Sequence, residues 1–94
     1  MSHLVERVRD AISSDRFVFS DHADEALAVR GVRGWQVLEA MDRAKLLGEF
    51  PRSRPNPKVE FEILLPDGTE AKAVWSWLGT SGTAKLVTVH FFDR

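Results

Sequence analysis

Residues 58–78, KVEFEILLPDGTEAKAVWSWL, have the clearest strand pattern of the chain, because apolar residues alternate with polar ones on both sides of a turn signal. Val59, Phe61, Ile63 and Leu65 are apolar, and the charged residues Glu60 and Glu62 lie between the first three of them. Residues 66–68, PDG, are typical of a tight turn, after which the alternation resumes. Residues 58–78 therefore predict two antiparallel strands joined by a hairpin.

A third strand is expected on the C-terminal side of this hairpin. Residues 79–82, GTSG, form a second turn signal, and the alternation continues from Ala84 to Phe92. Three strands joined by two short turns make an antiparallel meander over about residues 58–92. Its apolar face is expected to carry Val59, Phe61, Ile63, Trp75, Trp77, Val87 and Val89.

The N-terminal part of the chain has helical spacing instead. Apolar residues recur at helical intervals over residues 2–14. A second helix is expected from an N-cap at Ser20 to Arg30, with Gly31 directly after its end. Between these helices, residues 16–19 are either an extended connector or a brief edge strand.

A third helix is expected over residues 35–47, with Gly48 as its C-terminal breaker. Three prolines in residues 51–57 then predict a loop between the helical part, about 2–47, and the meander. Helices followed by strands are the α+β pattern. We therefore predict a single α+β domain over residues 1–94, with helices packed on a three- or four-stranded antiparallel sheet.

The composition excludes several classes of protein. The chain has 94 residues, of which 44% are hydrophobic and 29% charged, and this excludes extensive disorder. Cysteine is absent, which excludes disulfides, thiolate metal sites and cysteine nucleophiles. No apolar run reaches the roughly 20 residues of a membrane-spanning helix, and the charged first ten residues do not resemble a secretory signal. We therefore expect a cytoplasmic protein without membrane contact.

Charge is unevenly distributed along the chain. The formal net charge is −1, from 13 Lys and Arg against 14 Asp and Glu. The segment from residue 30 to residue 58 is basic, because Arg30, Arg33, Arg43, Lys45, Arg52, Arg54 and Lys58 stand against Glu39, Asp42 and Glu49. Arg52, Arg54 and Lys58 are candidate contacts for an RNA phosphate backbone or an acidic partner. The alternative is a solvated loop with scattered charges.

The polar face of the predicted meander carries titratable groups. Period-two alternation places on it Glu60, Glu62, Lys72, Ser76, Thr88 and His90. Lys72, His90 and a neighbouring carboxylate are competent for proton transfer and for holding a phosphate. The alternative is an ordinary solvated face, on which cross-strand Lys–Glu pairs add modest stability.

Two further candidates, His22 and Arg30, lie on the second predicted helix. His22, Ala26 and Arg30 follow one another at i+4 spacing, so they share one stripe that could address an anionic ligand. The alternative is a structural hydrogen bond for His22 and a favourable interaction of Arg30 with the helix dipole. The histidines lack His-x-x-x-His spacing, and no nucleotide-binding glycine motif is present, so neither a metal nor a cofactor is expected.

Several short motifs occur in an order that resembles a known family. They are Phe19-Ser-Asp-His-Ala23, Arg30-Gly-Val32, Val37, Phe50-Pro51 and Thr88-Val-His90. Over about residues 17–93 the chain resembles the domain-of-unknown-function family 4258. The resemblance implies an α+β fold similar to that of small toxins of the RelE, ParE and BrnT kind. Many of those toxins cleave messenger RNA, and their partners are antitoxin proteins.

The resemblance also suggests a catalytic set. Lys72 stands where the family commonly has a histidine, and His90 stands at the family's terminal tyrosine position. Metal-free RNA cleavage needs a base, an acid and cations around the phosphorane. His22, Arg30, Lys72 and His90 are the predicted catalytic residues, with a carboxylate such as that of Glu60 beside them. The leading hypothesis is a small toxin-like protein that interacts with RNA or acts as a metal-independent endoribonuclease.

The rival hypothesis is a binding module without catalysis. It would hold a protein partner or a second copy of the chain through the sheet edge or the loop at residues 51–57. The net negative charge favours this hypothesis, and so do Lys72 and His90, which differ from the residues that the family commonly has at these positions. The three tryptophans favour it as well, because aromatic residues are enriched at interfaces. The predicted partners are therefore an antitoxin protein, RNA or a second copy in a homodimer.

Overall fold

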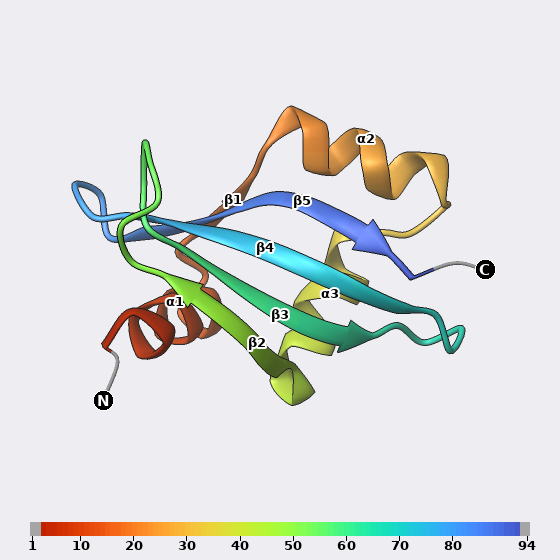
Figure 1. Ribbon diagram of the computed structural model, residues 1–94. Helices are drawn as coiled ribbons and strands as arrows, with labels where there is room; N and C mark the ends of the chain where they lie inside the picture. Colours follow the sequence, from red (N-terminus) through yellow and green to blue (C-terminus); the bar gives the residue numbers. More distant parts are fainter. Residues whose placement is uncertain (1–2, 93–94) are drawn as a thin grey trace.

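The computed structural model describes residues 3–92, which form three helices and a five-stranded sheet (Figure 1). The elements are α1 (His3–Ser13), β1 (Phe17–Phe19), α2 (Asp21–Val29), α3 (Gly34–Ala40), the 3₁₀ turn η1 (Met41–Arg43), β2 (Lys45–Phe50), β3 (Lys58–Leu64), β4 (Glu70–Leu78) and β5 (Thr83–Phe91). Helices α1 and α3 pack behind the sheet, and α2 lies along β5 (Figure 1). Within the described residues no helix covers the other face of β2, β3 and β4, which we call the open face.

The sheet confirms the α+β class but corrects the strand count. Its order is β1-β5-β4-β3-β2, so the predicted meander β3-β4-β5 lies in the middle and a further strand pairs on each side. The sheet is mixed, because β1 runs parallel to β5 whereas the other neighbours are antiparallel. The expectation of three or four antiparallel strands was therefore wrong.

Residues 17–19 form an edge strand, which decides between the two alternatives for this segment. Phe17 pairs with Ala84 and Phe19 with Leu86. The next residue, Ser20, caps α2 as predicted, since its Oγ accepts a 3.0 Å hydrogen bond from the backbone N–H of Ala23. The same hydroxyl donates to the carbonyl of Val87 at 2.7 Å and so joins α2 to β5.

The expected third helix over residues 35–47 was wrong in its second half. Helix α3 ends at Ala40, and after η1 the chain enters β2 over Lys45–Phe50. Gly48 is therefore a strand residue, next to a β-bulge, and does not end a helix. The apolar spacing of this segment also suits a helix. As a strand, however, β2 forms backbone hydrogen bonds with the edge of β3, and the local spacing of apolar residues does not reveal this stabilisation.

A second correction concerns β5. The pairing with β4 shifts between Val74 and Trp75, so that Leu86 pairs with Trp75 and Val87 is the extra residue of a bulge. Leu86 is fully buried, whereas Val87 is only half-buried. The expectation that Val87 lies on the buried face was therefore wrong, and Leu86 lies there in its place.

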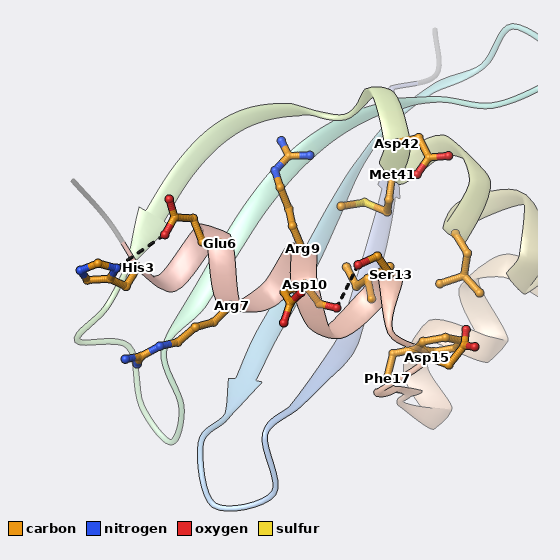
Figure 2. A pocket seen from close by; sticks show the side chains of 12 residues that line it. His3, Glu6, Arg7, Arg9, Asp10, Ser13, Asp15, Phe17, Met41 and Asp42 are labelled. Atoms are coloured by element: carbon orange, nitrogen blue, oxygen red, sulfur yellow. Dashed lines mark hydrogen bonds and ion pairs between the residues drawn. The ribbon is translucent and has the colours of Figure 1, made fainter.

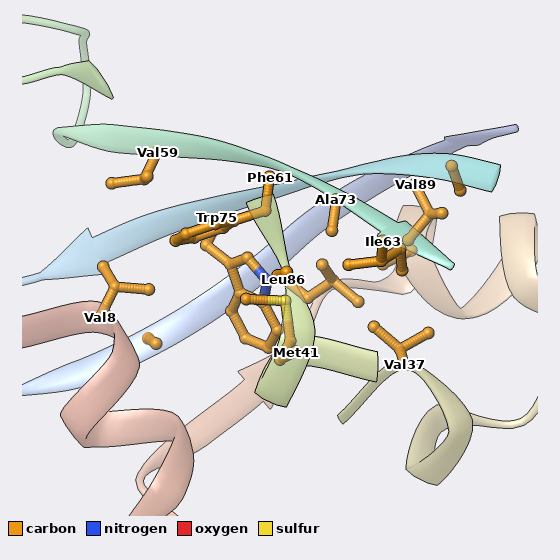
Figure 3. Packing of buried hydrophobic residues seen from close by; sticks show 14 of the residues in the cluster. Val8, Val37, Met41, Val59, Phe61, Ile63, Ala73, Trp75, Leu86 and Val89 are labelled. Carbon is orange, nitrogen blue, oxygen red and sulfur yellow. The ribbon is translucent and has the colours of Figure 1, made fainter. Parts of the chain in front are cut away.

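The core lies between the sheet and the helices (Figure 3). Its largest fully buried side chains are Trp75, Phe61, Ile63, Leu86, Val8, Val37 and Val59. The Trp75 ring meets the Phe19 ring edge-on, with centroids 6.2 Å apart. The Arg9 side chain reaches from α1 over the Phe61 ring and donates to the Ala44 carbonyl at 3.0 Å, which fixes the start of β2. Residues 3–92 contain no helix that is both long and apolar enough to span a membrane.

Candidate functional site

The open face brings two of the predicted catalytic residues together. Lys72 on β4 pairs with His90 on β5, and on its other side Lys72 pairs with Glu62 on β3. Directly opposite residues in an antiparallel pair have Cβ atoms about 4.5–5.5 Å apart. Glu62, Lys72 and His90 therefore form one row of a carboxylate, an ammonium and an imidazole across three strands.

Lys72 also has a partner in the neighbouring row. Its Nζ lies 3.7 Å from Oε1 of Glu60, in an ion pair whose two side chains are half-buried. His90 is exposed, and no hydrogen bond or ion pair within residues 3–92 holds its imidazole. Lys72 and His90, two of the four predicted catalytic residues, are thus adjacent on the sheet.

Arg30 lies on the helix-bearing side of the sheet. It caps the C-terminus of α2, and its guanidinium lies 4.6 Å from the centre of the Phe91 ring. Phe91 pairs with the buried Ala71, so it points to the face opposite to His90. The structure therefore does not bring Arg30 to the face that carries Lys72 and His90.

His22 is the second residue of α2 and its side chain is exposed. The neighbouring Ala23 and Leu27 form the buried face of this helix. No hydrogen bond or ion pair reaches the His22 imidazole from the described part of the chain. His22 therefore belongs to the solvent-facing part of α2, and no contact ties it to Lys72 or His90.

The candidate RNA contacts lie around the loop at residues 51–57. Arg52 and Arg54 are exposed, and the Arg54–Pro55 peptide bond is cis. Lys58 begins β3 opposite Phe50, the last residue of β2, and its Nζ lies 5.1 Å from the centre of the Phe50 ring. Phe50 as a whole residue is 41% exposed.

These loop-proximal side chains surround a shallow hollow. Phe50, Arg52 and Lys58 line a space of about 460 Å³ together with Glu49, Pro51 and Ser53. An exposed aromatic ring with two cations beside it can stack on a base and hold a phosphate.

The Phe50–Lys58 pair continues as a row across the open face. Lys58 pairs with Ser76, Ser76 with Lys85, and Lys85 with Val18. We call Phe50, Lys58, Ser76, Lys85 and Val18 the basic row. It contains two lysines and no carboxylate, whereas the next row on the open face contains Glu60 and the row after that contains Glu62. Because neighbouring strands lie about 4.8 Å apart, the basic row spans about 19 Å.

The sequence indicated only part of this row. Phe50 was predicted to lie just before a loop, and nothing local showed that it ends a strand beside Lys58. Lys85 was missed because the bulge at Val87 changes the phase of the alternation along β5. The one local signal for Lys85 is the alternation of Ala84, Lys85 and Leu86, in which Leu86 is as apolar as Val87.

No metal site or known relative adds to this description. Among residues 3–92 no group of three or more His, Asp or Glu side chains is placed to hold a metal ion. Comparison with family models, with curated proteins and with solved structures found no match to this chain. The resemblance to the family of toxin-like domains stays a prediction from the quoted motifs.

Proposed function

We propose that the protein binds single-stranded RNA with the basic row and the adjoining loop. The observation that carries the proposal is the exposed Phe50 ring beside Lys58, in a row without carboxylates that leads to Lys85. Proteins that bind single-stranded nucleic acid combine aromatic rings for base stacking with cations for the backbone. Arg52 and Arg54 extend the positive charge beyond the end of the sheet.

The proposal is for binding and does not include cleavage. Of the four predicted catalytic residues, Lys72 and His90 share the open face, whereas Arg30 lies over Phe91 on the other side. A phosphorane would then have Lys72 as its cation, and Lys72 is already paired with Glu60. Binding needs only the basic row and the loop, which are separate from this set.

Fluorescence anisotropy with a labelled single-stranded RNA of about ten nucleotides tests the proposal. We expect saturable binding that weakens as salt rises, and weaker binding of an RNA duplex, whose bases are not free to stack. The double variant Lys58→Gln/Lys85→Gln should lose most of the affinity. The charge-matched variant Lys45→Gln/Lys72→Gln, on the row of Glu62, should lose little. Equal loss in both would contradict a role for the basic row.

A second candidate function is dimerisation through β2. This strand is an edge of the sheet, and its Leu46 and Leu47 side chains are 42% and 45% exposed. Exposed apolar edge strands readily pair with another chain. In antiparallel pairing with a second copy, the end with Lys45 would meet the end with Glu49, so the charges are complementary.

Sedimentation velocity distinguishes this candidate. A β2-mediated dimer should dissociate in Leu47→Lys, because the ammonium would be buried at the centre of the new strand pair. Val29→Lys, at an exposed position on α2, is the matched control. A wild-type chain that stays monomeric at high concentration would rule the dimer out.

A further inference from the structure

A hollow of about 800 Å³ lies between α1, β1 and the α3–η1 segment, behind the sheet (Figure 2). Its floor is apolar and consists of Ile12, Phe17, Leu38 and Met41. We call it the helical groove. Its volume is in the range of about 300–1,000 Å³ that binding sites occupy, and it lies on the side of the sheet away from the basic row.

The shape of the helical groove suits a short helix. Residues from His3 to Ser13 line one side, which corresponds to about 15 Å of α1. Figure 2 shows Met41 and Asp42 on the other side of the groove from Asp10 and Ser13. Two helical walls with an apolar floor are the usual receptor for the apolar side of an amphipathic helix.

The apolar surface extends beyond the groove along α3. Trp35 precedes Leu38 by three residues, so the two side chains lie on the same side of this helix. Trp35 is 55% exposed as a whole residue. An indole so exposed next to an apolar floor is typical of a residue that anchors a partner.

The charge around the helical groove selects the kind of partner. Asp15 and Asp42 are exposed at one end, and no hydrogen bond or ion pair within residues 3–92 compensates their carboxylates. Arg16 pairs with Asp10 at 2.9 Å, whereas Arg9 donates to the neutral Ala44 carbonyl and keeps its positive charge. The groove is lined by the four carboxylates of Glu6, Asp10, Asp15 and Asp42 against the guanidinium groups of Arg7 and Arg9, so its net charge is negative beside apolar surface.

We propose that the helical groove binds an amphipathic helix of a partner protein, with apolar residues on one side and Lys or Arg residues flanking them. The apolar residues cover the half-buried Ile12, Phe17 and Leu38, and the basic residues lie against Asp15 and Asp42. This inference goes beyond RNA binding, because none of these residues belongs to the basic row or the loop.

A synthetic peptide of about 14 residues tests the proposal, with Leu at i, i+3, i+4 and i+7 and Lys on both flanks. Its binding is followed by amide NMR of the ¹⁵N-labelled chain. We expect saturable shifts around Phe17, Leu38 and Met41. A peptide with Glu in place of every Lys should bind at least tenfold more weakly, and salt should reduce that difference.

A pair of charge-matched variants completes the experiment. Asp15→Asn/Asp42→Asn should weaken binding of the Lys peptide about tenfold, and Asn suits position 15 because Asp15 has a φ of 61°. Glu25→Gln/Glu70→Gln makes the same charge change away from the groove and should leave binding unchanged. The proposal is overturned if the Lys peptide causes no saturable shifts at the groove, if both peptides bind equally, or if the two variants behave alike.

Discussion

The ammonium group of Lys58 lies 5.1 Å from the centre of the Phe50 ring, and the two residues are register partners on β3 and β2. The pairing holds a cation and an aromatic ring at one place on the open face. Phe50 as a whole residue is still 41% exposed. Because Lys58 lies over the ring, a base must displace the ammonium or stack on the other side of the ring, and in both cases Lys58 stays close to the phosphate.

Phe50→Ala should therefore weaken the binding of single-stranded RNA by about 1–3 kcal/mol, which is the usual contribution of one stacked base. Phe50→Trp should retain binding, because an indole also stacks. Fluorescence anisotropy measures both effects. Phe92→Ala is the control, since Phe92 is 48% exposed and lies outside the basic row. If Phe92→Ala has the same effect as Phe50→Ala, stacking at Phe50 is not the cause.

Gly34→Ala should destabilise the protein although alanine is the better helix former. A Cβ at position 34 would lie 2.6 Å from Cε2 of Phe19, so the ring or α3 must shift. Overpacking of this kind costs about 1–3 kcal/mol, which exceeds the roughly 1 kcal/mol gained from helix propensity. Urea unfolding measures the net change. Gly79→Ala meets only ordinary contacts, at 3.6 Å, and should change the free energy of unfolding far less.

Ser20→Ala should lower the free energy of unfolding by about 1–2 kcal/mol. It removes the N-cap of α2 and leaves the carbonyl of Val87 without the Ser20 hydroxyl. Ser13→Ala removes an exposed bond to the carbonyl of Asp10 and is the control. Amide exchange gives a second readout: with Ser20→Ala, opening should become easier in α2 than in β3. Uniform destabilisation of both elements would argue against a local link between α2 and β5.

Asp67 should make stability depend on pH in the acid range. The backbone N–H of Thr69 donates to Oδ1 of Asp67 at 2.9 Å and, with the Thr69 hydroxyl, holds the pKa of this carboxyl below its usual 3.8. A lowered pKa means that the ionised form favours the folded state. The contribution is complete above the pKa of the unfolded chain and is lost as pH falls through the folded pKa. NMR titration of the carboxyl carbon should give a midpoint below 3.8, and a midpoint at or above that value would contradict the prediction.

Local patterns predicted the elements whose stabilisation is local. The alternation over residues 58–78 correctly gave β3, β4 and the turn between them, because a strand with one buried face must alternate. The serine at position 20 and the glycine at position 31 correctly bounded α2, since a cap and a positive φ depend on neighbouring residues.

The position of a candidate site residue was predictable only where the alternation along a strand is enough to fix the face on which its side chain lies. Lys72 and His90 share the open face as alternation predicted, because no bulge separates them from their pairing partners. Arg30 was assigned to the same site from its position on a helix. Its actual position over Phe91 depends on how α2 lies against β5. The i+4 spacing of His22, Ala26 and Arg30 does not specify that packing.

The α+β class, the central meander and the capping of α2 were predictable from the sequence, because they follow from burial patterns and backbone preferences within a few residues. The tertiary structure alone decided that residues 45–50 form a strand, that β1 completes a mixed sheet, and that Phe50 meets Lys58. The physical reason is that an unpaired sheet edge offers backbone hydrogen bonds to any segment that reaches it, and this gain exceeds a helix preference of a few tenths of a kcal/mol per residue.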